Sequence, residues 1–301
     1  MQMSYMLLLL AMGAVWFPSI PLGCDSKLPL WAVFFMFAVV AGLVSAVLQF
    51  PALLSLGALA ICVWSSRQVV SKAWAMALTY LARFIALALA LHAFPGFRNV
   101  PLIMATRLTP DAAPFTQYLS FDKGAAGLFL LAAYARRCAV ATEWRAIALR
   151  TLVTMFATAI AVLDTAVVTG YVRPEIKLPS ITLEFLATNL FFTCIAEEAF
   201  FRGLIQERVI SFVEEKMPEK LLGRFCSREA TVLWISVAMS TLLFALAHIS
   251  GGPLFVLLAA IAGLGYSVVY AWTRRIEAAI LTHFFVNAVH FIAFTYPYRA
   301  N

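Results

Sequence analysis

Residues 253–272 have the sequence PLFVLLAAIAGLGYSVVYAW, twenty consecutive residues without a charged side chain. An apolar run of about 20 residues is long enough to cross the hydrocarbon core of a bilayer as one α-helix. Similar runs recur along the chain, and the first and third of them are short. The sequence therefore predicts an all-α fold, a polytopic integral membrane helix bundle of about eight to ten transmembrane helices. The candidate spans are residues 5–20, 29–49, 52–66, 74–94, 124–142, 151–171, 181–205, 230–249, 253–272 and 276–296.

The composition of the whole chain agrees with this class. Of its 301 residues, 63% are hydrophobic and 12% are charged, whereas about 25% of the residues in soluble chains are charged. A soluble domain of this length has too little interior to bury so much apolar surface. The net charge of +7 comes from basic residues crowded into a few loops, a distribution typical of membrane topology. We therefore expect membrane lipid around the protein and no nucleic-acid partner.

Lysine and arginine residues are unevenly divided between the loops that join these spans. Loops on one side of the ten-span arrangement hold thirteen of them, and loops on the other side hold five. Because cytoplasmic loops are enriched in lysine and arginine, the basic set is predicted to be cytoplasmic and both termini to lie outside. The basic loops are 66–72, 136–150, 206–229 and 273–275, and the opposite loops are 95–123 and 172–180.

The stretch TCIAEEAFFRG, residues 193–203, places ionisable side chains inside a predicted span. Charged groups are costly in a bilayer and mark candidate functional sites. Glu198 and Arg202 are four residues apart, so on a helix they share a face and can pair. Glu197 points to a different face. An unpaired carboxylate in apolar surroundings is suited to act as a general base near neutral pH.

Two further polar motifs follow this one. The sequence FALAH ends at His248, and the sequence HFFVN places His283 and Asn287 one helical turn apart on one face. Together these groups can activate water, because a carboxylate removes its proton, one imidazole assists, and the second imidazole and the amide donate to the developing oxyanion. One glutamate and two histidines would also suit a divalent metal such as zinc, and the spacing does not choose between the two.

The three motifs, taken in order, resemble those of the CPBP family, the CAAX protease and bacteriocin-processing enzymes, which include the eukaryotic type II CAAX prenyl endopeptidase. The resemblance covers residues 181–296. Within them, FRG at residues 201–203 and FALAH at residues 244–248 resemble the bacterial branch of the family. Residues 1–180 carry no recognised motif and form the N-terminal transmembrane region. The stretch between the first two motifs is longer than in compact members, which leaves the substrate range open.

The resemblance implies an intramembrane endopeptidase in a bacterial inner membrane that acts on a peptide or membrane-protein substrate. It implies that Glu197 activates water with His248 as its partner. By the same resemblance, His283 and Asn287 stabilise the oxyanion. Glu198 and Arg202 are supporting residues. Metal dependence is left open, and no other cofactor is expected.

Two other classes of function remain open from the sequence. A membrane scaffold or an immunity-type protein could keep this fold without hydrolysis, although the complete motif set argues against it. A transporter would explain the polar residues Arg83, His92 and Asp164 in or near other spans. Contacts between helices explain them more simply, and the internal symmetry of transporters is not visible.

The three motifs meet only if the helices depart from plain antiparallel spans. Plain spans would leave Glu197 near the cytoplasmic side and His248 near the outer side. We therefore expect the helix that carries Glu197 to continue to about Val213 and the chain to break at residues 251–253. The remainder of the charged segment 207–229 is expected to be solvated or to dock substrate, and residues 95–123 are expected to form an outward loop.

The predicted topology can be tested with single cysteines in place of Ser211 and Ser180, which should lie on opposite sides of the membrane. A membrane-impermeant thiol reagent added to intact cells is expected to label the Ser180→Cys variant and to leave Ser211→Cys unlabelled. Labelling of Ser211→Cys from outside would overturn the assignment of the basic loops to the cytoplasm.

Overall fold

The structure, a computed structural model, describes residues 2–23, 27–216 and 227–300. The chain divides into two compact units. The segment 181–296, predicted to be the core that carries the chemistry, supplies residues to both units, so its separation from residues 1–180 stays a prediction. The first unit comprises residues 1–104, 116–134 and 187–197, and the second comprises residues 105–115, 135–186 and 198–301.

Helices α1 to α5 are the framework of the first unit. Tyr5 on α1 is fully buried and donates a hydrogen bond to the backbone carbonyl of Leu119, with 3.0 Å between the oxygens. Helix α1 ends at Ala14, before the predicted end at residue 20, because Pro18 has no N–H to continue the helix. The elements are α1 (Met3–Ala14), β1 (Ile20–Pro21), β2 (Lys27–Leu28), α2 (Leu30–Val44), α3 (Phe50–Ser65), α4 (Lys72–Ala90) and α5 (Phe121–Tyr134).

Four long helices pack together in the second unit. Helix α6 is 28 residues long and begins ten residues before the predicted span, so part of the basic loop 136–150 is helical. Gly265 lets α11 approach α6 closely, since a Cβ atom there would lie 2.0 Å from the Thr158 hydroxyl oxygen. The helices are α6 (Ala141–Val168), α10 (Arg228–Ala247), α11 (Pro253–Thr273) and α12 (Ile276–Ala293), with a 3-10 turn, η3 (Ile249–Gly251), after α10.

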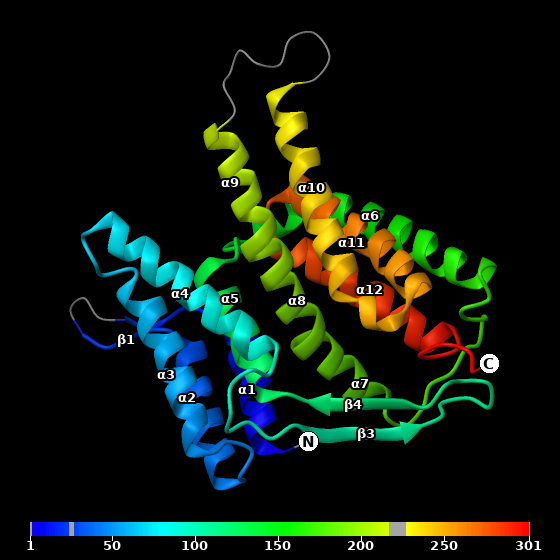
Figure 1. Ribbon diagram of the computed structural model, residues 1–301, viewed down its shortest axis with the longest axis horizontal. Helices are drawn as coiled ribbons and strands as arrows, with labels where there is room; N and C mark the ends of the chain where they lie inside the picture. Colours follow the sequence, from blue (N-terminus) through cyan, green and yellow to red (C-terminus); the bar gives the residue numbers. More distant parts are fainter. Residues whose placement is uncertain (1, 24–26, 217–226, 301) are drawn as a thin grey trace. The chain divides into compact units, whose positions relative to one another are not determined.

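The chain is helical without interruption from Thr182 to Lys216, and Figure 1 shows this stretch as one ribbon. The expected extension beyond the predicted span is confirmed. Two stretches are π-helical, so residues five apart stack there, and the Cys194 thiol contacts the Asn189 side-chain oxygen at 3.3 Å. The elements are α7 (Thr182–Thr188), η1 (Asn189–Ile195), α8 (Ala196–Glu198), η2 (Ala199–Gln206) and α9 (Glu207–Lys216). The rest of the charged segment, 217–226, lies outside the described residues.

The predicted class, a helical membrane bundle, is confirmed. Each of the ten predicted spans falls on a helix, and among the described residues five helices are long and apolar enough to cross a membrane: α4, α6, α10, α11 and α12. Helices α1, α2 and α3 are apolar but shorter. The number of spans stays a prediction. The segment 95–123 is not the irregular loop that the sequence predicts. It contains an antiparallel hairpin of β3 (Val100–Thr106) and β4 (Phe115–Leu119) (Figure 1).

Three of the basic loops meet at one carboxylate in the second unit. Glu207 pairs with Arg136 at 2.9 Å and with Arg274 at 2.7 Å, and it accepts a hydrogen bond from Tyr270. Arg136, Glu207 and Arg274 belong to loops 136–150, 206–229 and 273–275, respectively. Their convergence brings three of the basic loops together in this unit, and the side of the membrane that they face stays a prediction.

Gly127 on α5 provides a test of packing in the first unit. A Cβ atom at Gly127 would lie 2.7 Å from the Cβ and 2.8 Å from the Cα of Ala196, and a backbone atom cannot move aside cheaply. Gly127→Ala is therefore expected to lower the free energy of unfolding by about 1–3 kcal/mol. Gly57→Ala on α3 is the control, because nothing lies within 4 Å of its Cβ position. Equal melting temperatures for both variants in detergent would contradict this packing.

Candidate active site

Glu198 lies at the centre of a buried group of charged side chains in the second unit. Its carboxylate is 3.1 Å from the Arg202 Nε atom and 2.8 Å from the His283 Nδ1 atom. The side chains of Glu198 and Arg202 are 0% exposed, and that of His283 is 5% exposed. The predicted pair of Glu198 and Arg202 is confirmed, and His283 joins it from α12.

Arg202 is held by further contacts from α10 and α11. Its guanidinium donates to the backbone carbonyl of Gly263 at 2.9 Å, and its Cζ atom lies 4.7 Å from the centre of the Phe244 ring. Gly263 makes this arrangement possible, since a Cβ atom there would lie 2.9 Å from the Phe244 ring. Ser267, fully buried, contributes its hydroxyl oxygen at 3.4 Å. These contacts fix the guanidinium beside the Glu198 carboxylate.

His248 is held in one tautomer by the backbone. Its Nδ1 atom is 2.7 Å from the Phe244 carbonyl oxygen, which can only accept a hydrogen bond, so Nδ1 carries the proton. In the neutral ring Nε2 is then an acceptor. His248 ends α10, and the expected chain break follows it, where Gly252 has a φ of 86° that favours glycine. The half-buried imidazole lies against the Phe255 ring, 5.5 Å between centres.

His283 is oriented by two neighbours. Its Nδ1 atom faces the Glu198 carboxylate, and its ring stacks on Tyr266 with 4.5 Å between the centres and 16° between the planes. Because these contacts hold Nδ1 and one face of the ring, they also fix the direction in which Nε2 points. Asn287 follows one turn later on the same helix and is half-buried.

Glu197 has different surroundings from its neighbour in the chain. Its carboxylate is 3.0 Å from the Lys123 Nζ atom, and both residues belong to the first unit. The premise that Glu197 is unpaired was wrong. Its partner Lys123 is 74 residues away in the chain, in a predicted loop, so no spacing within one helix could have indicated the pair. The role of Glu197 as a base stays a prediction.

The structure gathers three of the six predicted residues around one aromatic ring. Phe244 contacts Arg202, and its ring centre lies 4.6 Å from that of His248 and 5.9 Å from that of His283. Tyr266, Ser267 and the carbonyl of Gly263 complete the group and were not predicted. Their only sequence signal is a run of small and polar residues within α11, which by itself is typical of helix packing.

A metal site is not supported by the arrangement of these side chains. Among the described residues, no three histidine, cysteine, aspartate or glutamate side chains are grouped as metal ligands. The zinc alternative requires about three protein ligands in one group, and the described side chains do not provide such a group.

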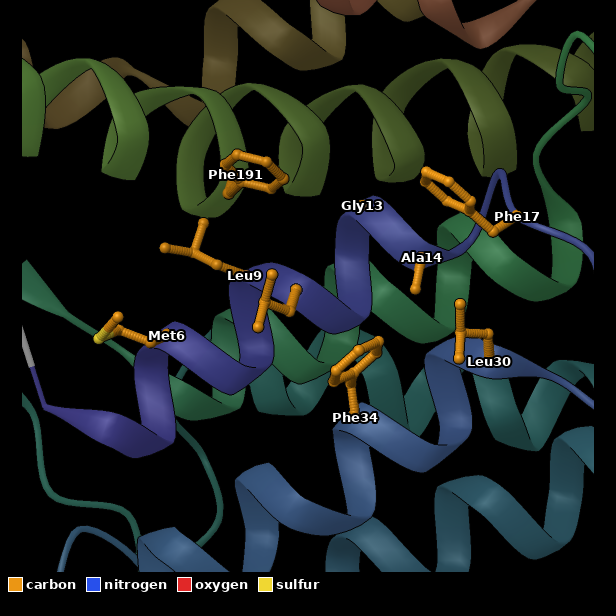
Figure 2. A pocket seen from close by; sticks show the side chains of 9 residues that line it. Met6, Leu9, Gly13, Ala14, Phe17, Leu30, Phe34 and Phe191 are labelled. Carbon is orange, nitrogen blue, oxygen red and sulfur yellow. The ribbon is translucent and has the colours of Figure 1, made fainter.

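An apolar groove of about 560 Å³ lies in the first unit, between α1, α2 and Phe191 (Figure 2). Figure 2 shows Met6, Gly13 and Phe34 among the residues around it. None of its lining residues is ionisable. It can supply contacts to hydrocarbon but no acid, base or nucleophile.

The buried pair makes a prediction about stability. Arg202→Met should lower the free energy of unfolding by about 3–5 kcal/mol, because it leaves Glu198 as a buried charge with less compensation. The double variant Glu198→Gln/Arg202→Met should cost less than the sum of its single changes. Asp111→Asn is the control, since its pair with Arg173 is 42% and 45% exposed and is worth about 0–1 kcal/mol. Unfolding in detergent measures all four, and an Arg202→Met variant as stable as Asp111→Asn would contradict the assignment.

Comparison with known proteins identifies the region that carries these motifs. Residues 179–289 match the family described as type II CAAX prenyl endopeptidase Rce1-like. The matched segment contains all three polar motifs and ends two residues after Asn287. No curated protein and no solved structure matches the chain closely enough to add to this. The match supports a place for residues 179–289 among the CAAX-type intramembrane proteases of the CPBP family.

Proposed function

We propose that the chain is an intramembrane endopeptidase that hydrolyses a peptide bond with water activated by Glu197 and His248. In this proposal His283 and Asn287 stabilise the oxyanion. The observation that carries it is the buried contact between Glu198 and His283, 2.8 Å long and almost closed to solvent. A carboxylate that orients an imidazole in this way is a recurring device of hydrolytic sites.

The first step is the attack of water on the carbonyl carbon of the substrate. The Glu197 carboxylate takes one proton from the water as the new C–O bond forms. His248 assists through Nε2, which accepts a hydrogen bond from the same water, because its Nδ1 proton is committed to the Phe244 carbonyl. The proton held by Glu197 then passes to the leaving amine as the C–N bond breaks. Water is consumed and no covalent enzyme intermediate forms.

The second requirement is stabilisation of the tetrahedral oxyanion. For Nε2 of His283 to donate a hydrogen bond while Nδ1 faces Glu198, the ring must carry two protons. The Glu198 carboxylate stabilises that imidazolium, as the aspartate does in a serine protease triad. Arg202 shares the same carboxylate and offsets part of its charge. Asn287 supplies a neutral donor one turn along α12.

The substrate proposed is a peptide or membrane protein that reaches the site within the bilayer. The matching family is described as type II CAAX prenyl endopeptidase Rce1-like, and a bacterial member in the inner membrane would act on other peptides or membrane proteins. A non-catalytic scaffold with the same fold is the second candidate. The buried and mutually oriented Glu198, Arg202 and His283 favour hydrolysis, because buried charges are costly to retain without a role.

The proposal is tested by comparing active-site variants on one substrate. Membrane proteomics of cells that carry Glu197→Gln, set against unmodified cells, first identifies an uncut protein whose cleavage-site peptide serves as the substrate. Glu197→Gln should abolish hydrolysis, and Glu198→Gln should reduce it less. Asn287→Ala should lower kcat roughly 100- to 1,000-fold at nearly unchanged KM, because its contact strengthens only in the transition state.

Melting temperatures measured on the same samples separate catalysis from stability. An Asn287→Ala variant that is destabilised but turns over normally per folded molecule would remove Asn287 from the site. Full hydrolysis by Glu197→Gln would reject the mechanism, and full cellular function of that variant would favour the scaffold.

A further inference from the structure

Lys123 lies in the first turn of α5, and its Nζ atom is 3.0 Å from the Glu197 Oε1 atom. The Lys123 side chain is 32% exposed and that of Glu197 is 17% exposed, so the pair is largely enclosed by protein. Both residues belong to the first unit. A pair at this depth is screened less by solvent than a surface pair.

The backbone that carries Lys123 is tied down by its neighbour in the chain. Asp122 is 1% exposed and accepts a hydrogen bond from the Lys123 backbone N–H at 2.9 Å. The same carboxylate is 2.7 Å from the His92 Nδ1 atom. The first turn of α5 is therefore anchored to His92, just after the end of α4, and this contact fixes the backbone position of Lys123.

Two glycines on α5 bring this helix against the segment that bears Glu197. Gly127 lies one turn after Lys123, on the same face, and its missing side chain leaves room for Ala196 at van der Waals distance. A Cβ atom at Gly124 would lie 2.8 Å from the Phe192 ring. Because Ala196 precedes Glu197 directly, the close approach at Gly127 places the carboxylate within reach of the ammonium group.

We propose that Lys123 is a positioning residue that holds Glu197 ionised and fixes the direction of its carboxylate. This inference rests on the proposed function, in which Glu197 is the base. Only the ionised carboxylate can take a proton from water. Apolar surroundings favour the neutral acid unless a cation lies close by, and Lys123 is such a cation.

Infrared spectroscopy of the purified full-length protein at neutral pH tests the ionisation directly, without a substrate. Lys123→Met is expected to gain the carbonyl band of a protonated carboxylic acid that the native protein and Lys123→Arg lack. The band should be missing from the double variant Lys123→Met/Glu197→Gln, which assigns it to Glu197. Lys123→Gln serves as a second neutral variant if Lys123→Met does not fold. A Lys123→Met or Lys123→Gln protein without the new band would overturn the inference, as would a band that survives Glu197→Gln.

Hydrolysis of the peptide identified by proteomics provides the second readout. Lys123→Met should lower kcat per folded molecule roughly 10- to 100-fold at similar KM, as expected when a base is misplaced, and Lys123→Arg should recover most of the loss. Arg67→Met is the control, because Arg67 also contacts α5, by donating a hydrogen bond to the Ala133 carbonyl.

The two proposals fail in different ways. An active Glu197→Gln enzyme rejects Glu197 as the base, whatever the infrared result. An inactive Glu197→Gln enzyme together with a fully active Lys123→Met enzyme keeps the base and rejects the positioning role. Equal losses in Lys123→Met and Arg67→Met would also reject it, because they would show a general effect of removing a cation from this region.

Discussion

The burial of one carboxylate, Glu198, governs the arrangement of the second unit. A buried charge is tolerated only when it is paired and hydrogen-bonded, and Glu198 meets this condition through Arg202 on its own helix and His283 on α12. Arg202 in turn requires acceptors, which α11 supplies through the Gly263 carbonyl and the Ser267 hydroxyl. The identities of small residues on α11 and of Phe244 on α10 follow from the need to enclose this group.

The same constraint explains the orientation of the two histidines. The Nδ1 atom of His283 faces a carboxylate, whereas the Nδ1 atom of His248 faces a backbone carbonyl. Two imidazoles of one site are thereby given different chemistry: one can donate to an anion and the other can accept from water. The difference arises from the partner of each Nδ1 atom and not from the residue type.

Adjacent glutamates likewise differ because of their partners. Glu198 pairs within the second unit, and Glu197 pairs with Lys123 in the first. The π-helical stretches on both sides of α8 alter the angular spacing along this helix, and such stretches are frequent at functional sites. A cation beside each glutamate allows two carboxylates to sit side by side in an apolar helix.

The sequence alone determined the membrane class, the helical nature of all ten predicted spans, the pairing of Glu198 with Arg202 and the three motifs of the family. These properties depend on local composition and on spacings within one helix. Only the tertiary structure decided the π-helical turns, the hairpin in the segment 95–123, and the partners of Glu197 and His283. Those contacts join residues 74 and 85 positions apart. Helical periodicity shows which face a side chain occupies, but it cannot show which other helix packs against that face.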